Sequence, residues 1–257
     1  MSTAVLPVDD ASMSLMEHLT ELRNRIIKVV LAVIIGMLIA FLLYDHIFNF
    51  LLQPYEDIAN RSTSLTGGRL LQVDPLEGFG IRMKLALYGG IGIAMPVILW
   101  QIWRFVTPGL YAHEKRYAVP FLASALSLFV MGAGLAYYTL PKALQWLISI
   151  GGTDNFVTAF APSKYFTLVT YMMLAFGIGF EFPILLVFLQ MAHILTPQQL
   201  SGARRYAVVG ILFIVAVITP SGDPISMLML SVPMVIFYEA SIVIGRLLGR
   251  RRTTSPA

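Results

Sequence analysis

Long apolar stretches without charges dominate this sequence. Residues 85–103 and 117–140 each hold at least 19 consecutive residues free of Asp, Glu, Lys and Arg. A helix needs about 20 mostly apolar residues to cross the hydrocarbon core of a bilayer. Only 12% of the chain is charged, whereas a soluble domain carries about 25%. The sequence therefore predicts an all-α polytopic membrane protein.

Six membrane-spanning helices are expected, and the last two are short. The six apolar segments cover residues 26–44, 85–103, 117–140, 165–195, 206–219 and 225–244. The fifth has 14 residues, and the uncharged part of the sixth ends after 14, at Glu239. Such helices reach only about 21 Å, so they would thin the bilayer or recruit a partner. The alternative is that the helices include Arg204, Arg205 and Glu239, with side chains that snorkel to the interface.

The basic residues predict the orientation. Twelve of the 18 lysines and arginines lie before or at the inner edge of the first span, after the sixth, or in the loops joining spans two to three and four to five. Cytoplasmic loops carry this excess, so both termini are expected in the cytoplasm. We divide the chain into a cytoplasmic amphipathic segment (1–25), a six-helix transmembrane domain (26–244) and a basic cytoplasmic tail (245–257). The first twenty residues contain acids but no Lys or Arg, so no cleavable signal peptide is expected.

The loops on the other side are expected to be structured. The long segment 45–81 contains Pro54 and Pro75 among apolar residues, and Pro162 lies at the end of the next outer loop. Amphipathic segments of this kind lie on a membrane surface. We expect short helices or turns there, forming a cap.

Two acids in or near the spans invite a functional interpretation. Glu181 lies within the fourth span, where a charge costs on the order of 2.5–3.5 kcal/mol. Pro183 frees a backbone carbonyl and predicts a kink. Glu181 is therefore either a polar floor for a substrate groove or a structural carboxylic acid bonded to that carbonyl. Asp223 follows Thr219 in the last outer turn, where it would accept amide hydrogen bonds at the start of the sixth span.

Two glutamates lie on the side that carries most of the basic residues. Glu21 belongs to an amphipathic helix that precedes the first span, and Glu114 lies in the first inner loop. Each alone is readily explained as a solvated charge. Together, two suitably spaced carboxylates could bind a pair of guanidinium groups through charge-assisted hydrogen bonds.

Four motifs resemble one known family. They are His18-Leu-Thr-Glu-Leu-Arg23, Gln101-Ile-Trp-Arg-Phe-Val-Thr-Pro-Gly-Leu-Tyr111 with Glu114-Lys-Arg116, Phe176-Gly-Ile-Gly-Phe-Glu-Phe-Pro183, and Thr219-Pro followed by Asp223. In this combination the chain resembles TatC, the multi-spanning subunit of the twin-arginine protein translocase. The likeness covers roughly residues 15–247. The turn Thr-Pro-Ser-Gly-Asp-Pro is longer than the family's common Thr-Pro-Pro-Asp form, which leaves the partner-docking residues beyond Thr219 open.

The resemblance implies a signal-peptide receptor rather than an enzyme, in a bacterial inner membrane. Glu21 and Glu114 would receive the twin arginines of folded cargo, and Glu181 would lie along the path of the peptide's apolar part. The surface around the two glutamates would be shaped by Arg23, Phe105, Pro108, Leu110 and Tyr111. Pro54, Thr219 and Asp223 would have structural or partner-binding roles. TatA-like and TatB-like single-span subunits would dock near spans five and six, and transport would use the proton-motive force without a cofactor.

Two other classes fit the sequence less well. A solute transporter needs ionisable groups near the midplane on more than one helix, and only Glu181 qualifies. An intramembrane protease needs catalytic residues paired within spans, whereas Asp45 and Asp223 lie at span ends. The chain has no cysteine, which excludes thiol catalysis and thiolate metal sites.

Overall fold

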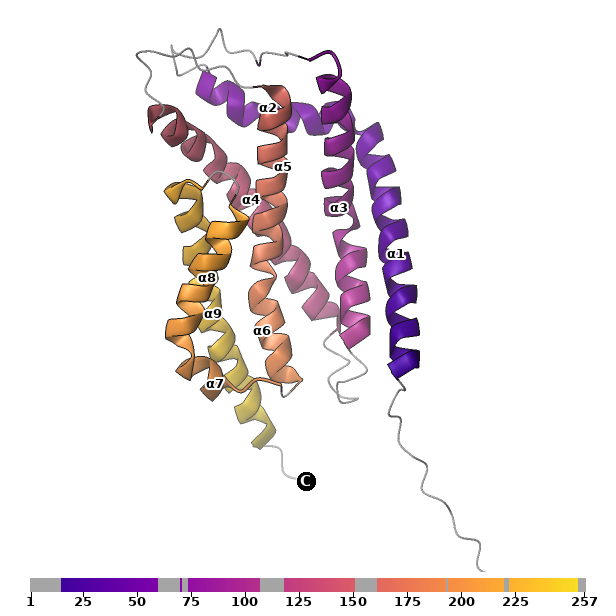
Figure 1. Cartoon of the computed structure of the whole chain (residues 1–257). Coiled ribbons are helices and arrows are strands. Elements are labelled where there is room, and N and C mark those ends of the chain that lie inside the picture. Colours follow the sequence, from indigo (N-terminus) through magenta and orange to yellow (C-terminus); the bar gives the residue numbers. More distant parts are fainter. Residues whose placement is uncertain are drawn as a thin grey trace, which may run out of the picture.

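The computed structural model describes residues 15–59, 70, 74–106, 118–150, 161–192, 194–219 and 222–253. Its described residues form helices joined by turns, with no strand among them (Figure 1). The helices are α1 (Leu15–Leu42), α2 (Tyr44–Ala59), α3 (Glu77–Val106), α4 (Ala118–Ile150), α5 (Pro162–Phe180), α6 (Phe182–Met191), α7 (Pro197–Gly202), α8 (Arg204–Ile218) and α9 (Pro224–Thr253).

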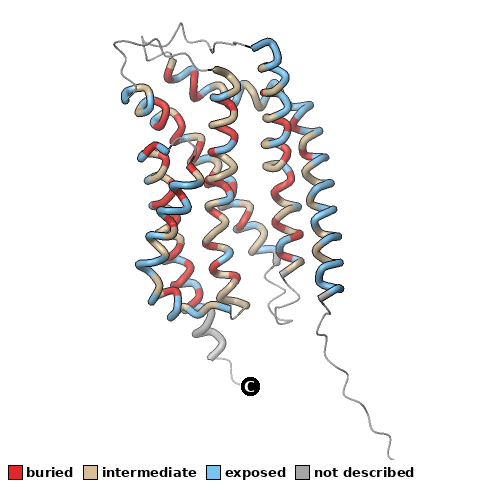
Figure 2. The backbone as a smooth tube through the Cα atoms, viewed as in Figure 1, coloured by how far each residue is buried: buried red, intermediate tan, exposed pale blue. Residues whose placement is uncertain are grey.

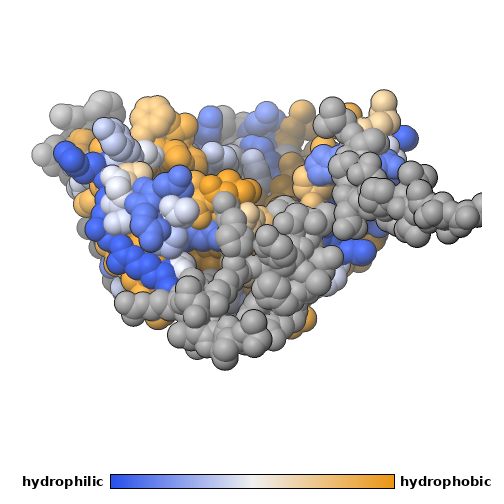
Figure 3. Space-filling view, turned by 90° about the horizontal axis from the view of Figure 1, so that it is seen from below, coloured by the Kyte–Doolittle hydropathy of each residue, from blue (hydrophilic) through white to orange (hydrophobic). Residues whose placement is uncertain are grey.

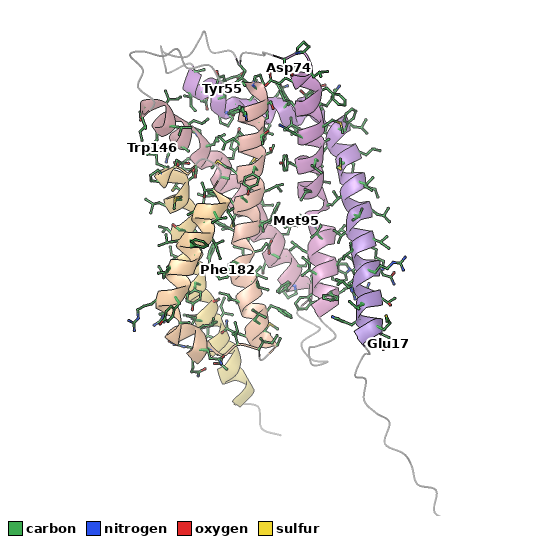
Figure 4. All side chains as sticks on the ribbon, in the orientation of Figure 1. Glu17, Tyr55, Asp74, Met95, Trp146 and Phe182 are labelled. Carbon is green, nitrogen blue, oxygen red and sulfur yellow. The ribbon has the colours of Figure 1, made fainter. Side chains whose placement is uncertain are left out.

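The chain crosses the molecule six times. Helices α1, α3, α4, α8 and α9 each cross once, α5 and α6 together make one crossing, and α2 lies across one end (Figure 1). Glu17 lies at the end where α1 starts, whereas Tyr55 and Asp74 lie at the opposite end (Figure 4). We call these the inner and outer ends. Helix α9 finishes at the inner end, where α1 starts, so the prediction of six spans that begin and end on the same side is confirmed.

The fifth span is short, as predicted, but the sixth is not. Helix α8 has 15 residues, which corresponds to about 22 Å, and it is shorter than the five helical stretches that are long and apolar enough to span a membrane. Helix α9 has 30 residues and continues past Glu239. Its apolar span, Pro224–Leu247, has 24 residues. The length expected for the sixth helix is therefore corrected.

An ion pair explains how α9 accommodates the charge that seemed to end it. Arg204 Nε lies 2.7 Å from Glu239 Oε1, and Arg204 Nη2 donates to Glu239 Oε2 at 2.9 Å. Both side chains are about half exposed. Arg204 is the first residue of α8, and Glu239 lies midway along α9. The alternative prediction, in which the last two membrane helices include their charged residues, therefore holds for Arg204 and Glu239.

Helix α5 occupies the centre of the molecule. Its residues Phe166, Met172 and Phe176 are at most 1% exposed, and they belong to the main hydrophobic cluster, which also includes residues of α2, α3, α4 and α9. Buried residues accordingly line the inward faces of the helices, whereas much of α1 faces outward (Figure 2). The outward residues of α1 are large and apolar, as expected for a lipid-facing surface.

Helices α1 and α3 pack backbone against backbone. A methyl group added to Gly36 would lie 2.4 Å from the carbonyl oxygen of Gly90, and one added to Gly90 would lie 2.5 Å from the amide nitrogen of Met37. Small residues permit this close approach between membrane helices. The contact fixes the register of α1 on α3, and therefore the position of α1 at the inner end.

Helix α2 is the outer-surface helix predicted within residues 45–81. Pro54 lies inside it and lacks the N–H that would bond to the carbonyl of Phe50. The hydroxyl of Tyr137 in α4 donates to that carbonyl at 2.9 Å. The hydroxyl of Tyr165 in α5 donates to the carbonyl of Leu51 at 2.7 Å. Two tyrosines thus hold the outer helix on the bundle at the turn that proline weakens.

Candidate functional site

The predicted site residues fall into three regions of the structure. Glu21, Arg23 and Phe105 lie near the inner end, Glu181 lies between α5 and α6, and Pro54, Thr219 and Asp223 lie near the outer end. Pro108, Leu110, Tyr111 and Glu114 fall outside the described residues. The distance between the two predicted arginine-binding glutamates is therefore left as a prediction.

The first turns of α1 lie against the last turn of α3. The ring of His18 stacks on that of Phe105, with 4.7 Å between centroids and 28° between planes. The structure thereby joins the first two motifs noted in the sequence. Phe105 also immediately precedes the loop that carries Glu114 in the sequence, so Glu21 and that loop belong to one end of one helix pair.

Glu21 is held by a neighbour on its own helix. The Nε and Nη2 atoms of Arg25 both donate to Glu21 Oε1, the first at 3.1 Å. The side chains of Glu21 and Arg25 are only 23% and 13% exposed. The other carboxylate oxygen, Oε2, is buried and has no hydrogen-bond partner in the described part of the chain. Glu21 therefore presents an incompletely satisfied carboxylate at the inner end.

Arg23 lies on a different face of α1 from Glu21. It is exposed, and two residues along a helix correspond to a rotation of about 200°. The structure therefore does not bring Arg23 together with Glu21. A shared role for the two would require a ligand that contacts both faces of the helix.

A buried glutamine shares the face of α3 that carries Phe105. Gln101 precedes Phe105 by one helical turn and is 9% exposed, and its Oε1 has no partner among the described residues. Trp103 points elsewhere, because its ring packs on Phe121 and Phe188 at 4.3 and 6.0 Å. Gln101 thus adds a second unsatisfied oxygen on the α1 side of α3.

Sequence reasoning overlooked three side chains at this end: His18, Arg25 and Gln101. In the sequence, His18 and Gln101 stand out only as members of the motifs, and Arg25 only as one of the basic residues before the first span. The four-residue spacing from Glu21 to Arg25 is a signal that was available, since it favours an intrahelical ion pair. The contact between His18 and Phe105 depends on how two distant helices pack and leaves no such local signal.

Glu181 occupies the break between α5 and α6, away from both ends, next to Phe182 in Figure 4. Its amide donates to the carbonyl of Ile178 at 3.0 Å, and Pro183 follows at the start of α6. Its Oε1 is buried without a hydrogen-bond partner in the described ranges. The carboxyl group is therefore available to a ligand with a hydrogen-bond donor, which leaves the groove interpretation open.

Close helix packing surrounds this break. A methyl group on Gly132 of α4 would lie 2.5 Å from the carbonyl oxygen of Phe176, and one on Gly177 of α5 would lie 2.6 Å from the ring of Phe129. Glu181 is thus positioned by a tightly packed pair of helices rather than by a loop.

The last outer turn has the geometry of a helix start. Asp223 is fully buried, and its Oδ1 accepts a hydrogen bond from the amide of Ser226 at 2.7 Å. Gly222 adopts a positive φ of 57°, a conformation that suits glycine. The hydroxyl of Thr219 donates to the carbonyl of Val215 at 2.7 Å. These contacts account for Thr219 and Asp223 as turn and capping residues.

The inner end is mixed in polarity. Hydrophilic residues gather on the left-hand part of this face, the side where α7, α8 and α9 lie in Figure 1 (Figure 3). Helix α7 begins with a capping box between Thr196 and Gln199, and Tyr238 of α9 donates to the carbonyl of Leu200 at 2.6 Å. The polar inner rim of these three helices is therefore ordered by specific bonds.

Comparisons with known proteins agree with one another. The family model described as Sec-independent protein translocase protein (TatC) matches residues 17–233. A protein of that name from Aquifex aeolicus is 39% identical over 93% of this chain and 98% of its own length. Another from Frankia casuarinae is 38% identical over 97% of this chain and 71% of its own. The crystal structure of a twin arginine translocase receptor, TatC, superimposes with a TM-score of 0.75 at 39% identity, covering 90% of this chain and 99% of that one.

Proposed function

Because this chain belongs to the TatC family, we propose that it is the receptor subunit of a twin-arginine protein translocase. It binds the twin-arginine signal peptide of folded cargo and recruits partner subunits for translocation driven by the proton-motive force. It is a multi-pass membrane protein, and the bacterial relatives favour the inner membrane as its location. The observation that carries the proposal is the match to a solved receptor along nearly its whole length.

The inner ends of α1 and α3 are the proposed signal-peptide site. The buried carboxylate oxygen of Glu21 needs a hydrogen-bond donor, and an arginine of the signal peptide would supply one in a charge-assisted bond. Glu114 would receive the second arginine. Phe105, which stacks on His18, would form the surface around the two glutamates, along with Pro108, Leu110 and Tyr111. Arg23 is exposed and would line the edge of this surface.

The apolar part of the signal peptide is proposed to run along the membrane face that contains Glu181. The unpartnered Oε1 of Glu181 supports this assignment, because a buried acceptor without a donor is costly. A passing peptide backbone or partner side chain would satisfy it. The helix is interrupted at Glu181, and Pro183 lies at the start of α6.

Single-span TatA-like and TatB-like subunits are the proposed partners, near α8 and α9. Helix α8 is shorter than the hydrocarbon core, and its outward residues are large and apolar, including Val209, Phe213 and Val217, each at least 67% exposed. A neighbouring helix would cover this surface at lower cost than a thinned bilayer. The structural roles proposed for Thr219 and Asp223 keep the outer ends of these two helices together, and Pro54 has the corresponding role in α2.

Binding of a synthetic twin-arginine signal peptide to the purified protein tests the receptor assignment. Glu21→Ala and Glu114→Ala should each weaken binding by at least about tenfold, which is the scale of losing a charge-assisted hydrogen bond. Glu239→Ala is the matched control, because it removes an acid at the same end that already pairs with Arg204. Equal binding by the double Glu21/Glu114 variant and the wild type would refute the site.

A further inference from the structure

We propose that Arg25 guards the signal-peptide site by occupying Glu21, and that this contact makes the receptor select arginine over lysine. The inference rests on the proposed function of Glu21. In the free protein the guanidinium group of Arg25 stands where an arginine of the signal peptide would bind. The incoming arginine must displace it.

Arg25 occupies one carboxylate oxygen of Glu21, and the other oxygen is buried. Two nitrogens of Arg25 converge on Glu21 Oε1, and the other oxygen, Oε2, is buried. A ligand that approaches Oε1 meets the guanidinium group directly. A ligand that seeks Oε2 must rotate the carboxylate outward, and this rotation breaks the contacts at Oε1. Either approach therefore requires Arg25 to move.

The chemistry of the exchange favours one kind of ligand. A guanidinium group donates in a planar fork, whereas an ammonium group is a compact, strongly hydrated point charge. When an arginine of the peptide displaces the Arg25 side chain, it forms a bond of the same kind with Glu21 and can also reach Oε2. When a lysine of the peptide displaces the Arg25 side chain, Glu21 loses a forked contact and gains only a contact with a single charge. Competition from Arg25 thus lowers the affinity for any signal peptide, and it lowers the affinity for a lysine peptide more than for an arginine peptide.

Burial distinguishes this contact from an ordinary surface ion pair. Arg25 is 13% exposed and Glu21 is 23% exposed, whereas Arg204 and Glu239 are 47% and 44% exposed. Exposed pairs at this spacing contribute little. If the Arg25 pair only supported the helix, removing it would weaken α1 and could not improve peptide binding. The two roles therefore predict effects of opposite sign.

The test measures the Kd of two synthetic signal peptides, one with Arg-Arg and one with Lys-Lys, for the full chain in detergent micelles. Arg25→Gln frees Glu21, and Arg25→Lys keeps the charge but removes the fork. Lys28→Gln controls for the loss of one positive charge on an exposed position of the same helix. Arg204→Gln controls for breaking an arginine–glutamate pair elsewhere at the inner end.

We expect Arg25→Gln to tighten Arg-Arg binding about two- to fivefold, the scale of a partly exposed ion pair, and to tighten Lys-Lys binding more. Arg25→Lys should change the Kd of both peptides in the same direction. The Lys28→Gln and Arg204→Gln controls should bind both peptides with the Kd of the wild type. Weaker Arg-Arg binding or an unchanged preference in Arg25→Gln would overturn the guarding role. Glu21→Ala separates the two proposals: if that variant still binds normally, the receptor site itself is wrong, whereas lost binding there leaves only the role of Arg25 in question.

Discussion

The imidazole ring of His18 stacks on the phenyl ring of Phe105 with 4.7 Å between their centroids. These residues lie 87 positions apart in the sequence, on antiparallel helices whose register is fixed by the contact between Gly36 and Gly90. The stack joins the segment that carries Glu21 to the helix that leads into the loop of Glu114. The packing of α1 on α3 therefore sets the position of one proposed arginine ligand relative to the other.

His18→Ala and Phe105→Ala should each weaken binding of a twin-arginine signal peptide about 2- to 10-fold, since an aromatic pair contributes about 0.5–1.5 kcal/mol. The double variant should lose less than the product of the two single effects, because both remove the same contact. Fluorescence anisotropy with a labelled peptide measures these losses. Fully additive effects would show that the two rings act separately.

Tyr137→Phe and Tyr165→Phe should loosen α2 without unfolding the bundle. Each removes a hydroxyl that donates to a carbonyl in the turn before Pro54. The loss at Phe50 costs about 1–3 kcal/mol, because Pro54 offers that carbonyl no amide donor. Hydrogen exchange followed by mass spectrometry should show faster exchange within residues 44–59. Tyr138→Phe is the control, because Tyr138 is exposed and contacts Lys142 instead. Unchanged exchange in the Tyr137/Tyr165 double variant would contradict the pinning of α2.

Gly132→Ala should destabilise the protein by about 1–3 kcal/mol, because the new methyl group would press on the backbone carbonyl of Phe176. Thermal unfolding in detergent should then occur about 2–10 °C lower. Gly134→Ala in the same helix has nothing within 4 Å of the added methyl group, and alanine favours helices. Its melting temperature should therefore equal or exceed that of the wild type. Equal losses in both variants would argue against the packing described at α4 and α5.

Replacements of Glu181 separate charge from hydrogen bonding. Glu181→Gln keeps the shape and an acceptor oxygen while removing a charge that is costly in the membrane, so export of a reporter cargo should continue. Glu181→Ala removes the acceptor, and export should fall severalfold at equal amounts of inserted protein. Immunoblots of membrane fractions provide that normalisation. If the glutamine variant is as defective as the alanine variant, the negative charge itself is required.

The fold followed from the sequence where local chemistry decides it. Mostly apolar stretches predicted the six spans, and the distribution of basic residues predicted their orientation. The predicted shortness of the sixth helix is wrong at α9, and the alternative in which the helix includes Glu239 is correct. In the structure the partner of Glu239 is Arg204, 35 residues earlier. A pairing over that distance neutralises the charge, and no local pattern indicates it.

The site was only partly predictable for the same reason. Glu21 was found because an acid is unusual on a basic face, and Glu181 because an acid is unusual in a span. The stack of His18 on Phe105 and the tyrosine bonds to α2 depend on tertiary packing. The contact from Arg25 to Glu21 is local, but nothing in the sequence says that one carboxylate oxygen remains buried and unsatisfied.

Photocrosslinking tests the central claim most directly. A signal peptide with a benzophenone side chain beside its two arginines is bound to the full chain, and the adducts are mapped by mass spectrometry. The receptor assignment predicts adducts within residues 15–25 and 101–116, and their loss in the Glu21→Ala/Glu114→Ala variant. Adducts concentrated on α7, α8 or α9, or adducts that persist in that variant, would contradict it.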